Sequence, residues 1–149
     1  MLVRVVLAVL LLPVISCVAV AADGASLYSE NCVACHQAGG VGTPGLAPPL
    51  VSDTLKKAGG VQPDYVALVV IHGLSGPIKV KGQVYVSAMP PRADFSDDEV
   101  AALANYVEAD LNGLKDGQFS RLAGADVAAL RKTTVDHQTL RDMRSKFGE

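Results

Sequence analysis

The chain has 149 residues, of which 13 are basic and 15 acidic, and it contains three Cys, three His and three Met. This length accommodates one domain of about 85–100 residues plus flanking segments, and a core that small is marginally stable without a bound cofactor. No cluster of basic residues is interleaved with aromatic ones, so the composition argues against binding of nucleic acid.

Residues 1–22 have the organisation of an export signal. Arg4 is the only charged residue before Asp23, and residues 5–15 form an apolar run. This run is too short to span a bilayer comfortably, but it matches the apolar region of a signal peptide. The small residues that follow suit cleavage and predict an exported protein whose mature chain begins at Ala22 or Asp23.

Cys17 lies within this segment and leaves two alternatives open. The sequence Val14-Ile15-Ser16-Cys17 resembles a bacterial lipobox, in which the Cys is lipidated and becomes the mature N-terminus. Lipidation would anchor the domain to a membrane, facing the periplasm. Otherwise Cys17 is discarded with the signal, the protein is periplasmic, and no membrane contact is expected.

A helix that includes the second cysteine, Cys32, is predicted after the signal segment. Gly24, Tyr28 and Cys32 recur every four residues, so they share one face of a helix from about Ala25 to Ala34. Gly24 would let another helix approach closely, and Tyr28 would supply an aromatic contact beside it.

Cys32, Cys35 and His36 form a Cys-x-x-Cys-His motif, which is an attachment site for c-type haem. In such a site the two thiols form thioethers with the haem vinyl groups, and the imidazole binds the iron from the proximal side. The motif therefore predicts one covalent haem c as the cofactor.

Two other chemistries use a Cys-x-x-Cys pair. A thioredoxin-like redox centre follows a strand of a βαβ unit, and no such pattern precedes Cys32. A zinc site needs two further Cys or His ligands at suitable spacing, and the spare candidates Cys17, His72 and His137 are scattered along the chain. Haem attachment is the favoured interpretation.

Residues 37–49 are rich in Gly and Pro, which predicts a loop. We expect the segment Pro48-Pro49-Leu50 to cross the proximal face of the haem. A backbone carbonyl of this segment would accept a hydrogen bond from the second ring nitrogen of His36, which fixes the imidazole tautomer.

Two shorter elements are predicted in the middle of the chain. Pro63 to His72 has the pattern of a short helix, with Pro63 at its first position and Gly73 at its end. Apolar residues alternate through 77–87, which predicts an extended segment with a small hairpin around Lys81-Gly82-Gln83.

Met89 is the favoured sixth ligand of the iron. It is followed by Pro90-Pro91, a stiff loop that can present a thioether. Met143 belongs to a helical apolar stripe, where Met usually packs, and His72 and His137 are the rival ligands. His/Met ligation leaves no open position for a substrate, so the site predicts an electron carrier and not an enzyme.

The best-marked helix runs from about Asp97 to Asp110. Ser96 and Glu99 form a capping box, and Phe95 and Val100 have the spacing of a hydrophobic staple. The remaining residues, 113–149, form a C-terminal extension.

Within that extension, 126–131 and 136–147 are predicted helices, the second with an apolar stripe of Leu140, Met143 and Phe147. The extension should pack back on the domain or onto another protein. Residues 23–110 carry a net charge of −5, whereas 111–149 carry +2.

From about Asp23 to Asp110, within an expected domain of residues 23–112, the chain resembles the class I, mono-haem cytochromes c of bacteria. The matching features are Gly24-x-x-x-Tyr28, Cys32-x-x-Cys35-His36, Pro48-Pro49-Leu50, Met89-Pro90 and Leu103-x-x-Tyr106. The resemblance implies an all-α fold wrapped around one haem. It also implies that the first and last helices cross, with Gly24 and Tyr28 against Leu103 and Tyr106.

A narrower resemblance concerns residues 70–78 with Gly82 and Tyr85. This pattern is similar to small cytochromes, or cytochrome domains, that accompany periplasmic dehydrogenases, and it implies that Tyr85 lies near the haem. The C-terminal extension departs from the minimal family pattern.

The implied function is one-electron transfer between redox partner proteins, such as a dehydrogenase donor and an oxidase or another cytochrome as acceptor. The alternative is a haem subunit of a dehydrogenase or oxidoreductase complex, docked through the extension. A haem enzyme or gas sensor would require a vacant sixth site, and thiol–disulfide exchange would require a protein without haem.

Overall fold

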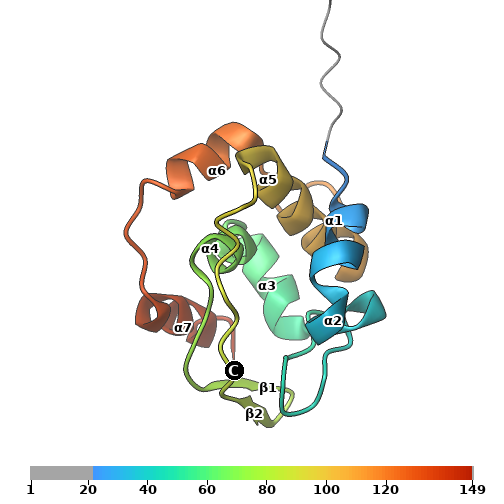
Figure 1. Cartoon of the computed structure of the whole chain (residues 1–149), viewed down its shortest axis with the longest axis vertical. Helices are drawn as coiled ribbons and strands as arrows, with labels where there is room; N and C mark the ends of the chain where they lie inside the picture. The colour runs from blue at the N-terminus through green and yellow to red at the C-terminus, as the bar shows by residue number, and fades with distance from the viewer. Residues whose placement is uncertain (1–21, 149) are drawn as a thin grey trace, which may run out of the picture.

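A computed structural model describes residues 22–148 of the chain. The predicted signal segment up to residue 21, including Cys17, lies outside the described residues. Within them the fold consists of helices and one small hairpin (Figure 1). The elements are α1 (Gly24–Asn31), α2 (Val33–His36), α3 (Asp53–Val61), α4 (Tyr65–His72), β1 (Ile78–Val80), β2 (Gln83–Tyr85), α5 (Asp97–Tyr106), α6 (Gly124–Leu130) and α7 (His137–Ser145).

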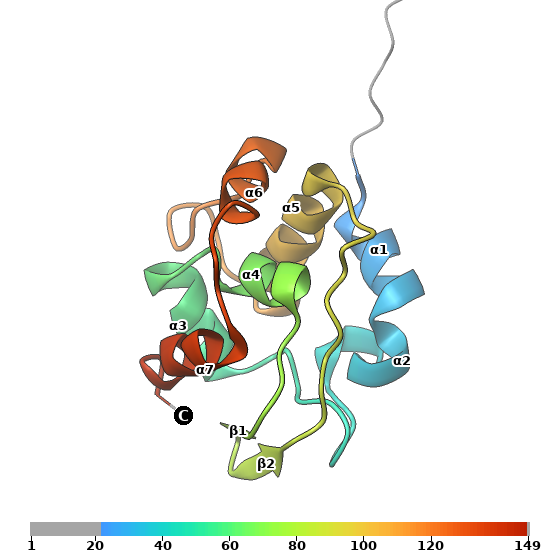
Figure 2. The ribbon, with the colours of Figure 1, turned by 60° about the vertical axis from the view of Figure 1, so that its left-hand side comes forward.

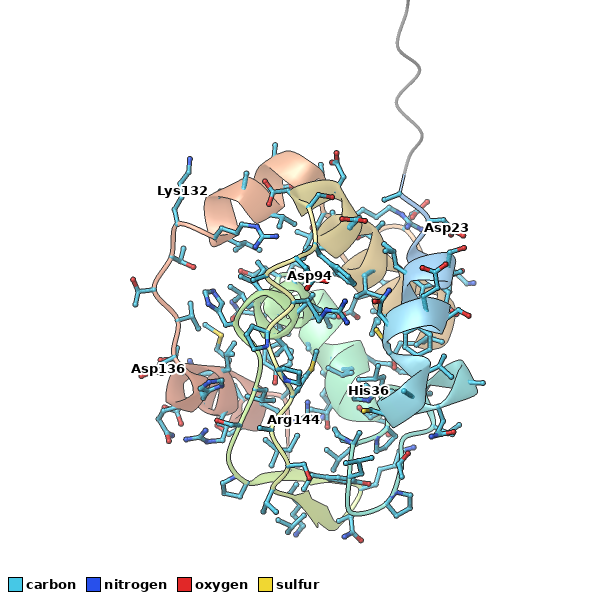
Figure 3. The ribbon with its side chains drawn as sticks, in the orientation of Figure 1. Asp23, His36, Asp94, Lys132, Asp136 and Arg144 are labelled. Atoms are coloured by element: carbon cyan, nitrogen blue, oxygen red, sulfur yellow. The ribbon has the colours of Figure 1, made fainter. Side chains whose placement is uncertain are left out.

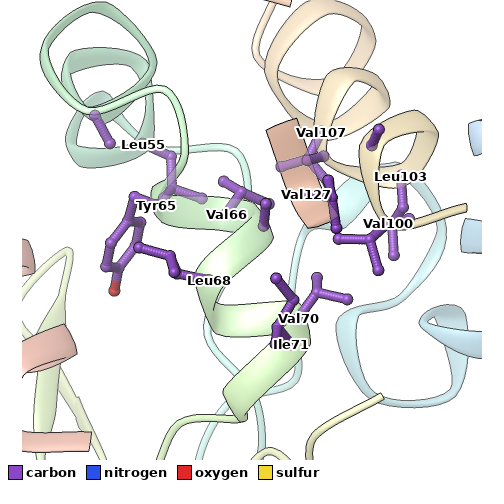
Figure 4. Packing of buried hydrophobic residues seen from close by; sticks show 14 of the residues in the cluster. Leu55, Tyr65, Val66, Leu68, Val70, Ile71, Val100, Leu103, Val107 and Val127 are labelled. Carbon is purple, nitrogen blue, oxygen red and sulfur yellow. The ribbon is translucent and has the colours of Figure 1, made fainter. Parts of the chain in front are cut away.

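Helix α4 lies at the centre of the molecule, and it packs against α5 on one side and α7 on the other (Figure 2). Its sequence is apolar around most of its circumference, as expected for a helix surrounded by others. Figure 4 shows side chains of α4, such as Val66 and Val70, close to Val100, Leu103 and Val107 of the α5 segment. In the part of the chain described, no helix combines the length and apolarity needed to cross a membrane.

The predicted crossing of the first and last helices of the domain is confirmed. Gly24 lies so close to α5 that a Cβ there would come within 2.7 Å of the Tyr106 Cβ and would clash with the Ala102 carbonyl oxygen. The rings of Tyr28 and Tyr106 are 5.5 Å apart between centroids. Contact at this distance requires a residue without a side chain at position 24.

Gly24→Ala is therefore expected to lower the free energy of unfolding by about 1–3 kcal/mol, because the added methyl group forces the two helices apart. Gly60→Ala is the matched control. Gly60 also lies in a helix, and a Cβ there would meet its nearest neighbour at 3.4 Å, so the higher helix propensity of Ala should leave stability equal or raised. Thermal unfolding checks both variants, and equal losses would contradict the close-contact explanation.

The start of α5 also confirms the prediction. The Ser96 hydroxyl accepts the Glu99 N–H at 3.3 Å, and the Glu99 carboxylate accepts the Ser96 N–H at 2.7 Å. Phe95 and Val100 are both buried. After Tyr106 the helix continues as a π-helical turn, Val107–Leu111, which the sequence did not predict.

Helix α3 is absent from the sequence predictions. Its two glycines lower the helix propensity of the segment, and its N-terminal signal is a single cap, in which the Ser52 hydroxyl accepts the Leu55 N–H at 3.2 Å. Helix α4 begins at Tyr65 instead of Pro63 and ends before Gly73 as predicted.

The hairpin is confirmed. Strand β1 pairs antiparallel with β2, and Ile78 is opposite Tyr85. Lys81 and Gly82 both have positive φ, of 50° and 80°, as a two-residue hairpin turn requires.

Both predicted helices of the C-terminal extension are present, and the extension packs back on the domain. Helix α6 lies against α5 and buries Val127, whereas α7 lies against α4 and buries Leu140 and Phe147. These three side chains belong to the same hydrophobic core as α4 and α5.

Candidate functional site

Cys32 and Cys35 lie at the junction of α1 and α2, one helical turn apart. The Cys32 N–H donates to the Tyr28 carbonyl at the end of α1, and the Cys32 carbonyl accepts the His36 N–H at 2.8 Å. Cys32 is half-buried and Cys35 is exposed, and both are free thiols. This turn presents two sulfurs and one imidazole from five consecutive residues.

The His36 side chain is buried, with 8% of its surface exposed. Its Nδ1 lies 2.9 Å from the Pro48 carbonyl oxygen, which confirms the contact expected between this imidazole and the proline segment. Because a carbonyl only accepts hydrogen bonds, Nδ1 carries the proton and Nε2 keeps a free lone pair. Burial lowers the pKa of His36, and the Pro48 carbonyl partly opposes that shift, so the ring is neutral and able to bind a metal.

Gly42 positions the proline segment. Its φ is +78°, and a Cβ there would come within 2.5 Å of the Pro49 nitrogen and 2.7 Å of the Pro48 carbonyl carbon. The Gly42 N–H also donates to the His36 carbonyl at 2.8 Å. One glycine therefore joins the end of α2 to the segment that orients its imidazole.

A mainly apolar cavity opens in front of His36. It is lined by residues from most of the fold, and these include six of the seven predicted site residues. Pro49 is the exception, since it does not line the cavity. The predicted residues in the wall are Cys32, Cys35, His36, Pro48, Tyr85 and Met89. Further lining residues include Tyr28, Leu50, Val66, Val70, Leu74 and Leu103.

Met89 reaches this wall from a loop fixed to the end of α4. Its backbone pairs with Leu74 through two hydrogen bonds, of 2.8 and 3.0 Å. Gly73, with a φ of +72°, allows the close approach, because a Cβ there would come within 2.6 Å of the Met89 carbonyl oxygen. The Met89 side chain is half-buried against the core.

The rival ligands occupy other positions. The cavity wall does not include His72, His137 or Met143, which all belong to the part of the chain that the structure describes. His137 Nδ1 accepts the Ser75 N–H at 3.1 Å, and Met143 packs against the core from α7.

The alternative chemistries lose support. In residues 22–148 no three His, Cys, Asp or Glu side chains come together as a metal cluster, so the zinc interpretation fails there. Burial raises the pKa of the Cys32 thiol, with Arg92 opposing the shift, whereas reactive redox thiols have a lowered pKa.

Sequence reasoning missed four polar residues in the cavity wall. Arg92 bonds to Asn31 Oδ1 at 2.8 Å and to the Asp94 carboxylate, so it joins the Met89 loop to α1. Tyr65 and Arg144 line the wall as well, from α4 and α7. Only long-range packing brings Asn31, Tyr65, Arg92 and Arg144 to one cavity, and no local pattern signals it.

Comparison with known proteins agrees with this geometry. The family model described as cytochrome c oxidase, cbb3-type, subunit III, matches residues 19–107. The chain belongs to the class I, mono-haem cytochrome c family. It is 37% identical over 131 residues to a cytochrome c-552 of Thermus thermophilus, covering 85% of this chain and 98% of that protein.

A second cytochrome c-552, from a named strain of Thermus thermophilus, is also 37% identical and is covered to 86% of its length. An alignment that covers 85% of this cytochrome c necessarily reaches into its C-terminal extension, beyond the part that the family model matches. At least part of the extension therefore has a counterpart in these relatives.

Membership of the family implies covalently bound haem c, an electron-carrier function and no catalytic reaction of its own. The site fits that cofactor, because it combines two free thiols one turn apart, a neutral imidazole with a free Nε2 and a mainly apolar cavity in front of them.

Proposed function

We propose that this cytochrome c carries single electrons between exported redox partners, with Cys32 and Cys35 as haem thioethers and His36 and Met89 as axial ligands. The supporting observation is that His36 and Met89, from separate segments, line one cavity, whereas His72, His137 and Met143 do not. When bound, the haem iron supplies a one-electron Fe(III)/Fe(II) couple. The residues of the chain hold it, exclude water from it and set its potential.

Two axial ligands from the protein leave no coordination position for a substrate, which favours a carrier over a haem enzyme or gas sensor. The Pro48 carbonyl would hold the His36 ring and increase its basicity, and the thioether of Met89 would raise the potential relative to a second imidazole. Pro48 and Tyr85, which line the cavity, would complete the surroundings of the haem, whereas Pro49 would act only through its neighbour Pro48.

Electrons would pass through the haem edge beside Cys35. Cys35 is exposed, as are its neighbours Ala34 and Gln37 and, on the Met89 loop, Ala88 and Pro90. Electron-transfer proteins typically meet their partners through small, transient contacts, and these exposed residues are the expected contact. Residues 23–110 carry a net charge of −5, so a basic partner would be attracted to this domain.

Salt dependence tests this charge argument. Oxidation of the reduced protein by a cationic ruthenium ammine should slow roughly two- to fivefold when the ionic strength rises from 10 to 200 mM, because screening removes the attraction. Oxidation by anionic ferricyanide should accelerate over the same range. Stopped-flow absorbance gives both rates, and the same salt response for both reagents would refute steering by the acidic domain.

We further propose that residues 1–22 direct export to the periplasm, and that Cys17 anchors the protein to the membrane only if it is lipidated. A dehydrogenase as donor and an oxidase or another cytochrome as acceptor fit such a location.

The second candidate is a haem subunit of an oxidoreductase complex, and the family description, which names an oxidase subunit, favours it. Native purification of the full chain distinguishes the two hypotheses. A free carrier should elute at the size of a small protein, whereas a subunit should elute together with its complex. Deletion of the extension is a poor test, because Leu140 and Phe147 belong to the core.

A further inference from the structure

The cavity has a polar corner formed by Tyr65 and Arg144. Both side chains are buried, with 1% and 6% of their surfaces exposed, and both line the cavity. The Tyr65 hydroxyl lies beside the Arg144 guanidinium, and the hydroxyl proton has no acceptor among the described residues. Burial raises the pKa of Tyr65, so this hydroxyl stays a neutral donor.

Several contacts hold α7, the helix that carries Arg144, beside the cavity. On the same face of α7, His137 Nδ1 accepts the Ser75 N–H at 3.1 Å, and the Arg141 guanidinium donates to the Ser75 carbonyl. One turn beyond Arg144, the ring of Phe147 packs edge-on against Tyr65, with 5.4 Å between centroids. These contacts fix the position of the helix from which Arg144 reaches the cavity wall.

The chemistry of haem indicates what this corner faces. The two vinyl groups and the two propionates lie on opposite edges of the porphyrin. Thioether bonds to Cys32 and Cys35 would place the vinyl edge at α2, so the propionate edge would point across the cavity, away from α2. In Figure 3, α7, which carries Arg144, and α2, which carries His36, lie on opposite sides of the molecule, and both residues line the cavity between them.

The second guanidinium in the wall is on the wrong edge for this role. The positive charge of Arg92 opposes the rise that burial causes in the pKa of the Cys32 thiol. Its guanidinium also donates to Asn31 Oδ1 at 2.8 Å and pairs with the Asp94 carboxylate at 2.8 Å. It therefore belongs to the thioether side of the cavity.

We propose that Arg144 and Tyr65 bind a haem propionate, with the guanidinium N–H groups and the hydroxyl donating to the carboxylate oxygens. A guanidinium and a carboxylate match in charge and in geometry, and the hydroxyl supplies an additional donor. This inference rests on the proposed attachment of the haem at Cys32 and Cys35. It makes the C-terminal extension part of the cofactor site.

The electrostatic consequence can be measured. Next to Arg144 the propionate stays ionised, and the guanidinium offsets its negative charge near the iron. Without Arg144 the propionate carboxylate should take up a proton within the physiological pH range, and it should do so more readily when the iron is reduced. The reduction potential should then fall with rising pH wherever this proton is released.

The experiment compares Arg144→Gln, Tyr65→Phe and wild type by haem mass and by reduction potential from pH 5 to 8. All three should carry one covalent haem. Arg144→Gln should show an additional fall of potential with rising pH that wild type lacks, and Tyr65→Phe a smaller one. Arg141→Gln is the matched control on the same helix, and it should lose stability and keep the pH profile of wild type.

A uniform shift of potential in Arg144→Gln without new pH dependence would overturn the proposal, and so would the same new slope in Arg141→Gln. If Arg144→Gln does not accumulate, Arg144→Lys and Tyr65→Phe provide the test. Each should show a smaller fall of reduction potential with rising pH than is expected for Arg144→Gln. A wild-type pH profile in both variants would refute the proposal. A wild-type protein without haem would instead refute the attachment site itself.

Discussion

Met89→Ala is expected to abolish the charge-transfer band between the Met sulfur and ferric iron and to lower the reduction potential by on the order of 0.1 V or more, since axial ligands set haem potentials over roughly 0.8 V. The side chain lines the cavity from a loop fixed to Leu74 by two backbone hydrogen bonds. Truncation removes the thioether without disturbing that pairing. Absorbance of the ferric protein and a redox titration measure the two effects.

Met143→Ala is the control. Its side chain packs against the core from α7 and does not line the cavity, so this variant should lose stability and keep both the band and the potential. Persistence of the band in Met89→Ala, or its loss in Met143→Ala, would show that the sixth ligand has been assigned to the wrong residue.

Glu108→Gln is expected to stabilise the protein above neutral pH. Glu108 lies in the π-helical turn after α5, is 1% exposed, and its two carboxylate oxygens have no hydrogen-bond partner among the described residues. A Cβ at Gly59 would clash with this carboxylate, so α3 covers it closely. Burial raises its pKa to about 8, from an ordinary value of 4.5.

The direction of the pH effect follows from this shift. Between pH 4.5 and 8 the folded protein holds a proton on Glu108 that the unfolded chain releases. The contribution of this group to stability is therefore fully present below pH 4.5 and is lost as the pH rises through 8. The loss from this group is about 5 kcal/mol, which is large against a typical total of about 5–15 kcal/mol.

Denaturant unfolding at pH 5 and pH 8 measures this loss of stability. Glu108→Gln should remove most of the difference between the two pH values, whereas Glu30→Gln, on the exposed face of α1, should leave it unchanged. A wild-type protein that is equally stable at both pH values would show that Glu108 is solvated or paired.

The parts predicted from sequence are those whose signals are local. Cys32, Cys35 and His36 lie within five residues, the cap of α5 lies within four, and Gly24 and Tyr28 follow a helical period. Each of these patterns could therefore be recognised without knowing the fold. The expected hydrogen bond from His36 to the proline segment and the crossing of α1 with α5 came from the family resemblance and from ligand chemistry, and the geometry confirms both.

The parts that escaped prediction depend on long-range packing. Two glycines weaken the local signal of α3, yet Leu55 and Ala58 form a buried face that stabilises the helix once the core is present. Arg144 reads in the sequence as one more charge on an amphipathic helix. Its burial in the cavity wall is decided by how α7 docks on α4, which no local pattern encodes.

Mass spectrometry of the mature protein, exported from a host that attaches haem c, tests the haem assignment most directly. The mass should equal that of the cleaved chain plus one haem, and the same sample should show Soret absorbance. A colourless protein with the mass of the bare chain and two free thiols at Cys32 and Cys35 would contradict it.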